Sequence, residues 1–251
     1  MTVRSILVAA AVGLGAAVAF AAQTGTFRLH AEGVDAPVVS RLHADLIWAE
    51  RRVEGVLGEF PDTVAVHVHP GRKAFSAALR DRWGMPETAC WMVGAAGAGV
   101  IHLLSPDAWA REACEHDPED AGHVRRLIAH EATHAYHGQV NPSGDLGSLE
   151  GIAWFIEGVA TYVSGQLEAR HAGRAEEVVA RGDCPASLAR AWEGPDRYGV
   201  AGSLVAFIDR TWGRETLLRL LAATSQDEIL RGLGTTESDL LTAWEEWVAS
   251  S

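Results

Sequence analysis

The residues with the clearest chemical potential in this chain are two histidines and a glutamate. His130 and His134 are four positions apart, so on an α-helix both imidazoles point to the same side, about 6 Å apart along the axis. They can therefore bind one metal ion. Glu131 projects about 100° away around the helix, where a carboxylate can reach a water molecule held by the metal. This pattern is typical of metal-assisted hydrolysis; the alternative is a pair of core or surface histidines beside a solvated glutamate.

The segment around these residues is predicted to be a buried helix. Asp117 is a suitable N-cap, Pro118 suits the first helical position, and Gly138 supplies a stop. An apolar stripe leads into the face that carries the two histidines. The stripe consists of Val124, Leu127 and Ile128.

A second apolar segment, residues 154–162, supplies a candidate third ligand. Glu157 is its single carboxylate, 23 residues after His134. Burying an unpaired carboxylate is costly, and a metal ion would remove that cost. Gly158 and Ala160 are small enough for this helix to approach the metal helix closely. The alternative is an exposed Glu157 on an amphipathic helix.

Together the two segments resemble the gluzincin metallopeptidases, the class of thermolysin and the zinc aminopeptidases. The resemblance covers about residues 94–212 and lies in His130-Glu131-x-x-His134 and Trp154-x-x-Glu157-Gly158-x-Ala160-x-Tyr162. It implies that His130, His134 and Glu157 bind one zinc ion and that Glu131 is the general base. Thermolysin-like enzymes carry an aspartate four residues after the glutamate ligand, whereas this chain has Thr161.

The resemblance also implies a catalytic tyrosine and a substrate-binding strand. Tyr198 is similar in position to the tyrosine with which aminopeptidases stabilise the oxyanion, although a core tyrosine would look the same in sequence. An edge strand that binds substrate main chain would correspond to residues 98–103. From the residues alone, the run 94–106 fits either a sheet edge or a hairpin turn followed by an interior strand. The aminopeptidase motif for a free substrate amino group is not recognisable in residues 94–99.

The fold implied by the resemblance is α+β, a thermolysin-like zincin catalytic domain. A small mixed-sheet upper lobe with the metal helix would occupy residues 24–138 and a helical lower lobe residues 139–251, with the zinc site on the central helix between them. Hydrophobic periodicity in the residues predicts strands at 26–29, 63–69 and 100–104, and helices at 37–57, 72–83, 186–192, 199–212, 215–223 and 238–248.

The strand at residues 63–69 places His67 and His69 on one face, opposite three valines. Two histidines spaced in this way can chelate a metal. The pattern favours the other interpretation, in which they occupy the wetter face of a half-buried strand.

Residues 1–22 are predicted to be a secretory signal peptide, which leaves residues 23–251 as a single domain. Arg4 supplies the positive start, residues 6–18 the apolar core and Ala19-Phe20-Ala21 the cleavage site. The alternative is an uncleaved membrane anchor over residues 5–22. Either way the rest of the chain is expected outside the cytoplasm, in the periplasm, at the cell surface or secreted.

Export permits a disulfide, and the three cysteines allow one pair. Cys90 and Cys114 flank a segment whose ends can meet, so they are the preferred pair, with Cys184 free. The alternative is three reduced, buried thiols.

Charge and composition limit the partners. The 251 residues are 48% hydrophobic, enough to bury a sizeable core, and the net charge of -12 argues against a nucleic acid or an acidic membrane surface. The sequence therefore predicts an exported zinc peptidase that acts on peptides or proteins. The alternative is a zinc-binding protein of gluzincin fold with little or no catalysis; the presence of Glu131 favours the enzyme. The sequence does not indicate an oligomeric state or a substrate preference.

Overall fold

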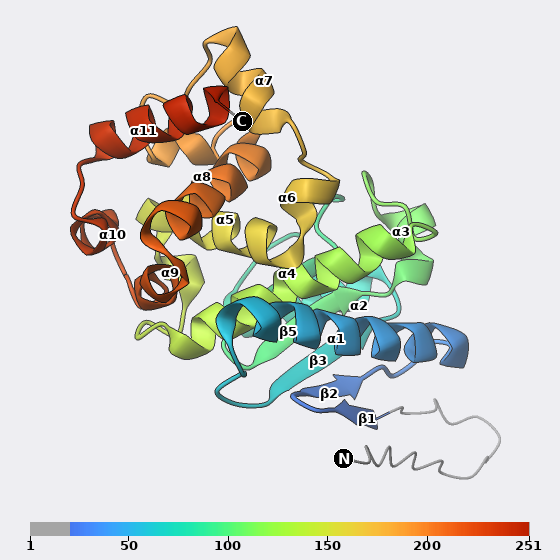
Figure 1. Ribbon diagram of the computed structural model, residues 1–251. Helices are drawn as coiled ribbons and strands as arrows, with labels where there is room; N and C mark the ends of the chain where they lie inside the picture. The colour runs from blue at the N-terminus through green and yellow to red at the C-terminus, as the bar shows by residue number, and fades with distance from the viewer. Residues whose placement is uncertain (1–20, 251) are drawn as a thin grey trace, which may run out of the picture. The chain divides into compact units, whose positions relative to one another are not determined.

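The computed structural model describes residues 21–250, which form a mixed α+β structure that is mostly helical and contains one sheet (Figure 1). The chain divides into two compact units, one ending at Ala135 and the other beginning at Tyr136. This boundary falls within helix α4 (Ala121–Val140), the predicted metal helix. The predicted signal peptide or anchor lies outside the described residues except for Ala21 and Ala22, which begin strand β1.

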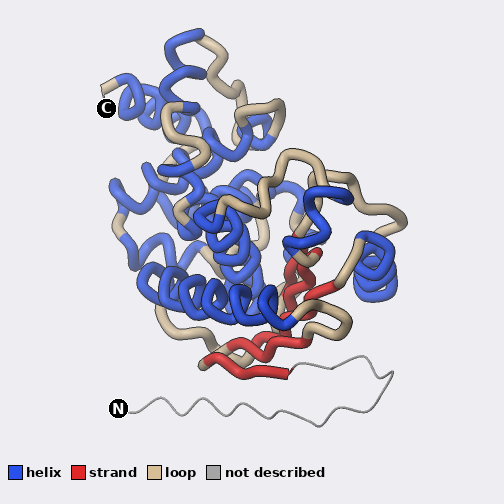
Figure 2. Tube along the Cα trace, turned by 90° about the vertical axis from the view of Figure 1, so that its right-hand side faces the viewer, coloured by secondary structure: helices blue, strands red, loops and turns tan. Residues whose placement is uncertain are grey.

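The sheet of the first unit has five strands in the order β1-β2-β3-β5-β4, shown in red in Figure 2. Strands β2, β3 and β5 are parallel, and β1 and β4 pair antiparallel with β2 and β5. The sheet is therefore mixed, as predicted. Its strands are β1 (Ala21–Thr24), β2 (Phe27–His30), β3 (Val64–His69), β4 (Gly94–Gly97) and β5 (Val100–Leu104).

Residues 94–104 combine both predicted alternatives. Strand β4 lies at the edge of the described sheet, Gly99 makes the turn with a positive φ of 76°, and β5 is an interior strand. The expectation that residues 98–103 form the edge strand is therefore wrong. The small residues of β4 take the edge because the apolar side chains of β5 are buried on both faces, as an interior position requires.

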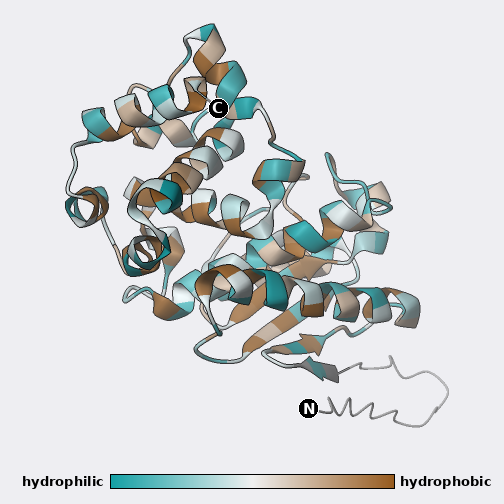
Figure 3. Cartoon of the chain, in the orientation of Figure 1, coloured by the Kyte–Doolittle hydropathy of each residue, from teal (hydrophilic) through white to brown (hydrophobic). Residues whose placement is uncertain are grey.

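The helices of the first unit follow the predicted periodicity. Helix α1 (Ala36–Leu57) buries an apolar stripe, and Figure 3 shows apolar and polar residues alternating around it. Helix α1 lies beside α4, where the guanidinium of Arg125 is 4.8 Å from the ring centroid of Trp48. Helix α2 (Arg72–Trp83) has the predicted bounds, and the short α3 (Pro106–Glu112) was not predicted.

Both predicted ends of the metal helix are wrong. Helix α4 begins at Ala121, and Asp120 Oδ1 accepts a hydrogen bond from the backbone N–H of His123, as an N-cap side chain does. Asp117 instead accepts from the N–H of Glu119. Gly138 does not stop the helix, because one interior glycine costs only about 1 kcal/mol and the turn around it is buried.

The second unit consists of helices. Helices α8, α9 and α11 were predicted, α7 and α10 were not, and the helix expected at residues 186–192 is only a 3-10 turn at its end. The elements are η1 (Leu146–Ser148), η2 (Glu150–Ile152), α5 (Ala153–Ser164), α6 (Gln166–Ala169), α7 (Arg174–Arg181), η3 (Ala189–Trp192), α8 (Arg197–Trp212), α9 (Arg214–Leu220), α10 (Gln226–Leu233) and α11 (Glu237–Ala249).

Helices α5 and α8 pack closely at Gly158. A Cβ built on Gly158 would lie 2.5 Å from the carbonyl oxygen of Ala201 and 2.9 Å from Cγ2 of Val205. The sequence correctly indicated that this glycine permits a close helix contact, but the partner is α8. Glycine is required here because any side chain would collide with the backbone of α8.

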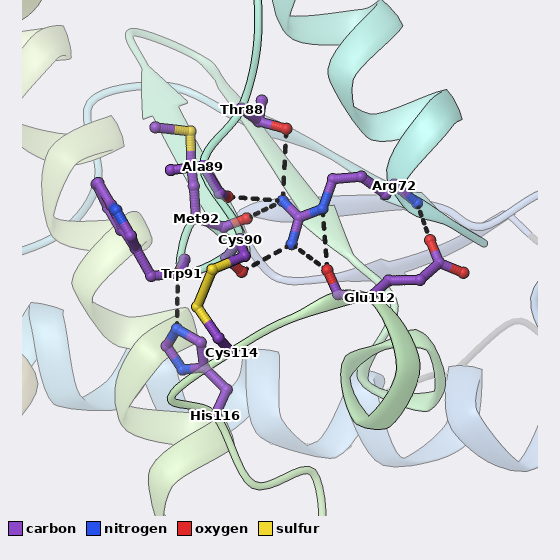
Figure 4. Close-up of a disulfide and its surroundings, with 9 residues drawn as sticks. All are labelled: Arg72, Thr88, Ala89, Cys90, Trp91, Met92, Glu112, Cys114 and His116. Atoms are coloured by element: carbon purple, nitrogen blue, oxygen red, sulfur yellow. Dashed lines mark hydrogen bonds between the residues drawn. A yellow bond between two sulfur atoms is a disulfide. The ribbon is translucent and has the colours of Figure 1, made fainter.

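The predicted disulfide is present, between Cys90 and Cys114, whose Cα atoms are 5.3 Å apart, and Cys184 is free. Figure 4 shows how Arg72 organises the loop beside it: the guanidinium donates to the carbonyl oxygens of Ala89, Cys90, Met92 and Glu112. The loop that leads into the edge strand is thus fixed covalently and by hydrogen bonds. Within residues 21–250, no helix is both long and apolar enough to span a bilayer.

Candidate metal centre

Helix α4 brings the two predicted histidine ligands together as their spacing requires. The Nε2 atoms of His130 and His134 are 3.0 Å apart, and the rings meet at an interplanar angle of 82°. Each side chain is only 8% exposed. Two buried imidazole nitrogens at this separation can bind the same ion at zinc–nitrogen distances of about 2.0–2.1 Å.

Glu131 lies against the edge strand of the sheet. A Cβ built on Gly94, the first residue of β4, would lie 2.6 Å from Oε1 of Glu131. Glu131 is also only 8% exposed. The carboxylate therefore occupies the space that a side chain at position 94 would fill, a requirement for glycine that sequence reasoning did not identify.

Glu157 completes a group of three metal-binding side chains. His130, His134 and Glu157 each offer one ligand atom, and these atoms lie within 4.8 Å of one another. Glu157 is half-buried, whereas the residues beside it in α5 are buried. Within the second unit, the last turns of α4 pack on α5, where the rings of His137 and Phe155 are 6.1 Å apart.

Two imidazoles and one carboxylate are a donor set found in catalytic zinc sites, which leave one coordination position open. The three side chains therefore fit zinc, and the cluster fits a zincin. His137 is not part of the group: it is fully buried, and its Nε2 lies 3.0 Å from the carbonyl oxygen of Leu221. It anchors the end of α4 within the second unit.

Tyr198 lies in the first turn of α8, in an aromatic group. Its ring stacks on His171 at 5.5 Å and meets Trp192 edge-on at 4.8 Å, and the Arg197 guanidinium is 5.2 Å from the ring centroid. The ring is half-buried. Its role toward an oxyanion stays a prediction.

Thr161 occupies the position at which thermolysin-like enzymes carry an aspartate, and it packs against α8. A Cβ built on Gly202 would lie 2.9 Å from Cγ2 of Thr161. Thr161 is fully buried, and its Oγ1 has no hydrogen-bond partner among the described residues. The side chain thus serves helix packing, and a carboxylate would not fit this apolar contact without a cost.

Comparison with known proteins gives a structural similarity only. No family model matches the chain, and no curated protein matches it. Among solved structures, 25 chains match. An M1 zinc metallopeptidase from Deinococcus radiodurans is 15% identical with a TM-score of 0.46, covering 92% of this chain and 50% of that one.

A two-domain M1 zinc metallopeptidase variant bound to L-tryptophan is 16% identical with a TM-score of 0.48, covering 90% of this chain and 50% of that one. The chain thus spans about half the length of the solved structures that it matches. At this level of similarity, the activity must be argued from the residues of the site.

Proposed function

We propose that this protein is a zinc-dependent peptidase, with zinc bound by His130, His134 and Glu157 and with Glu131 as the general base. The observation that carries the proposal is a buried carboxylate, Glu131, next to one ligand of a three-ligand group. A protein that only binds zinc has no need of such a carboxylate. When bound, zinc supplies a Lewis acid that polarises the scissile carbonyl and acidifies water.

The protein groups then have defined tasks. Glu131 accepts the proton of the attacking water and returns it to the nitrogen of the leaving amine, a contribution of about 10²–10⁴-fold to the rate. Tyr198 donates a hydrogen bond to the oxyanion, where loss of one donor typically costs about 2.7–4 kcal/mol of barrier.

Strand β4 is suited to hold the substrate. It lies at the edge of the described sheet, its residues Gly94–Gly97 carry no side chain larger than a methyl group, and Gly94 adjoins Glu131. An extended peptide that added to this edge would place its main chain beside the base. The expected substrate is therefore a peptide or an unfolded protein segment.

The remaining parts of the proposal concern fold and location. The mixed sheet with α4 and the helical second unit would correspond to the upper and lower lobes of a thermolysin-like zincin. The disulfide between Cys90 and Cys114 supports export, because such bonds persist in oxidising compartments and are rare in the cytosol. Cleavage after Ala21 would leave most of β1 in place, because Ala22 to Thr24 pair with Leu29 to Phe27.

The test is cleavage of a mixed peptide library, read by mass spectrometry, with zinc-loaded protein and its Glu131→Gln variant compared. Glutamine keeps the shape of the side chain but cannot accept the proton, so the variant should retain zinc and lose its cuts. Glu168→Gln, a change on helix α6, is the matched control and should cleave as the natural protein does.

Cuts that survive in Glu131→Gln would contradict the base assignment. A folded, zinc-bound natural protein that makes no cuts would favour the second candidate, a gluzincin-fold protein that uses its zinc site in recognition or assembly.

A further inference from the structure

Four histidines form a continuous row on one face of the sheet, outside the proposed zinc centre. His30, His67 and His102 occupy directly paired positions on β2, β3 and β5, the three parallel strands visible in Figure 1. His69 lies two residues beyond His67, on the same face. We call these four residues the histidine ladder.

The rings of the ladder are stacked. The ring centroids of His30 and His67 are 4.9 Å apart, and those of His67 and His102 are 5.2 Å apart, with interplanar angles of 14° and 19°. His69 stacks on His102 at 5.2 Å. Cross-strand pairing fixes this arrangement, because side chains directly opposite on parallel strands project from the same face.

Two nitrogens of the ladder already have the separation of two ligands on one metal ion. His69 Nε2 and His102 Nδ1 are 3.0 Å apart. When two nitrogens bind one metal ion in adjacent positions, each about 2.0–2.1 Å from the metal, the nitrogens lie about 3 Å from one another. Without a metal, the same geometry accommodates a hydrogen bond from one neutral imidazole to the other.

Helix α2 covers this end of the ladder with aromatic rings. Phe75 meets His69 at 6.0 Å and Trp83 meets His102 edge-on at 5.4 Å. His102 is buried, His67 and His69 are half-buried, and His30 is exposed. Water and small ions can therefore approach along the row.

Three histidines of the ladder, His67, His69 and His102, have lowered pKa values. Burial, followed by the neighbouring histidines, lowers the pKa of His69 and of His102 to about 4. Burial, followed by His30, lowers the pKa of His67. These imidazoles are neutral at pH 7, and a neutral imidazole can donate its lone pair to a metal without first losing a proton.

We propose that His69 and His102 bind a divalent transition-metal ion, Cu²⁺ most tightly, with His67 as the adjacent imidazole of the site. Imidazole nitrogens suit Cu²⁺, Ni²⁺ and Zn²⁺, and Cu²⁺ ranks highest in the general order of affinity. Two imidazoles leave positions for water, which a tetragonal Cu²⁺ ion accepts readily. This site is independent of the proposed zinc centre.

The charge of Arg82 opposes the site. Its positive charge, after burial and the neighbouring histidines, contributes to the lowered pKa of His102. The same charge disfavours a metal cation. Arg82 is exposed near the C-terminal end of α2, so its replacement tests the electrostatics without removing buried packing.

The experiment uses the full chain with His130→Ala and His134→Ala, so that the zinc centre does not take copper. Cu²⁺ is added to one equivalent and followed by electron paramagnetic resonance, which reports nitrogen ligands. We expect one bound ion with imidazole hyperfine structure. His69→Gln and His102→Gln should each lose that ion or its nitrogen pattern, whereas His43→Gln, a change on α1, should retain both.

The variant Arg82→Gln should lower the Kd for Cu²⁺. Because this exposed substitution leaves the histidines in place, it tests the site even where the His69→Gln or His102→Gln variant fails to fold. Unchanged copper binding in His69→Gln and His102→Gln would overturn the proposal. Copper binding that is lost only in the variant His123→Gln would also overturn the proposal. The ion would then be bound by His116 and His123, whose Nδ1 and Nε2 atoms are 2.8 Å apart. Peptide cleavage plays no part in these readouts, so they stand apart from the peptidase proposal.

Discussion

Gly94 and Glu131 are so close that a Cβ on Gly94 would lie 2.6 Å from the carboxylate Oε1 and 2.8 Å from Cδ of Glu131. Neither residue is near the other in sequence. The sheet edge therefore shapes the position of the proposed general base, and a methyl group at position 94 must displace that carboxylate. The fold can absorb the change, because the displaced atoms belong to the end of a flexible side chain.

Gly94→Ala should leave the protein folded and zinc-bound while lowering peptide cleavage. A misplacement of about 1 Å can cost about 10²-fold in rate, and we expect a loss of that order in kcat. The measurement is kcat and zinc content on a peptide found in the library screen.

The matched control for this prediction is Gly97→Ala on the same strand. There the three atoms nearest to the added Cβ all belong to Trp83, the closest at 3.3 Å, whereas at Gly94 they all belong to Glu131. If both variants lose cleavage equally, side chains on β4 obstruct substrate in general and the specific link to the base fails.

The histidine pair and Glu131 could be predicted from sequence because helical geometry alone relates positions 130, 131 and 134. Glu157 was also identified, through the cost of a carboxylate in an apolar segment. Gly94 was not: its requirement depends on strand β4 passing the helix, a long-range packing relationship that no local pattern expresses. The same holds for the partner of Gly158, which is α8.

Elements with strong periodicity, such as α1, α2, β3 and β5, were predicted nearly to the residue. The ends of α4 were not, since two aspartates compete as N-caps and only the chain's three-dimensional path selects Asp120. The short helices α7 and α10 were missed because fewer than three turns give too little periodicity. The histidine ladder could not be predicted, because it depends on the register of three strands, which the sequence does not supply.

Glu157→Ala should sharply reduce zinc content, because two imidazoles alone leave the ion with too few protein ligands. Zinc per chain after dialysis, measured by plasma mass spectrometry, checks this. The exposed Glu176→Ala on α7 is the control and should bind zinc normally. Undiminished zinc in Glu157→Ala would remove this residue from the centre.

Tyr198→Phe should lower kcat and leave zinc content and KM close to those of the natural protein. Phenylalanine keeps the stacking with His171 and the edge contact with Trp192, so only the hydroxyl is lost. A barrier increase of about 2.7–4 kcal/mol corresponds to a lost oxyanion donor. A kcat equal to that of the natural protein would show that the hydroxyl takes no part in catalysis and that Tyr198 only packs within the aromatic group.

Gly158→Ala should destabilise the second unit. Its Cβ would lie 2.5 Å from the backbone oxygen of Ala201, so helices α5 and α8 must separate or shift. Overpacking of this kind costs about 1–3 kcal/mol, measurable as a lower urea midpoint. Gly151→Ala, where the added Cβ has no neighbour within 4 Å, should leave the midpoint unchanged. Equal urea midpoints for both variants would show that helix α8 shifts to accommodate the added methyl group without a loss of stability.

Asp209 should make the second unit lose stability in acid. Its burial raises the pKa of the carboxyl, but hydrogen bonds from Arg214 and Tyr162 outweigh this, so the pKa lies below the ordinary 3.8. The unfolded chain thus binds the proton more readily, and the stabilisation is complete above the unfolded pKa and lost as pH falls through the folded one.

The variant Asp209→Asn isolates this effect, because asparagine cannot titrate. At about pH 6 the natural protein should be more stable by about 1.5–3 kcal/mol, the range for hydrogen bonds with charged groups, and the difference should shrink below about pH 4. Urea unfolding at several pH values measures it. Asp107→Asn, which removes an exposed ion pair with Arg41, should shift stability little. A stability gap between the natural protein and the Asp209→Asn variant that stays constant down to acid pH would mean that packing, and not the charge of Asp209, stabilises the unit.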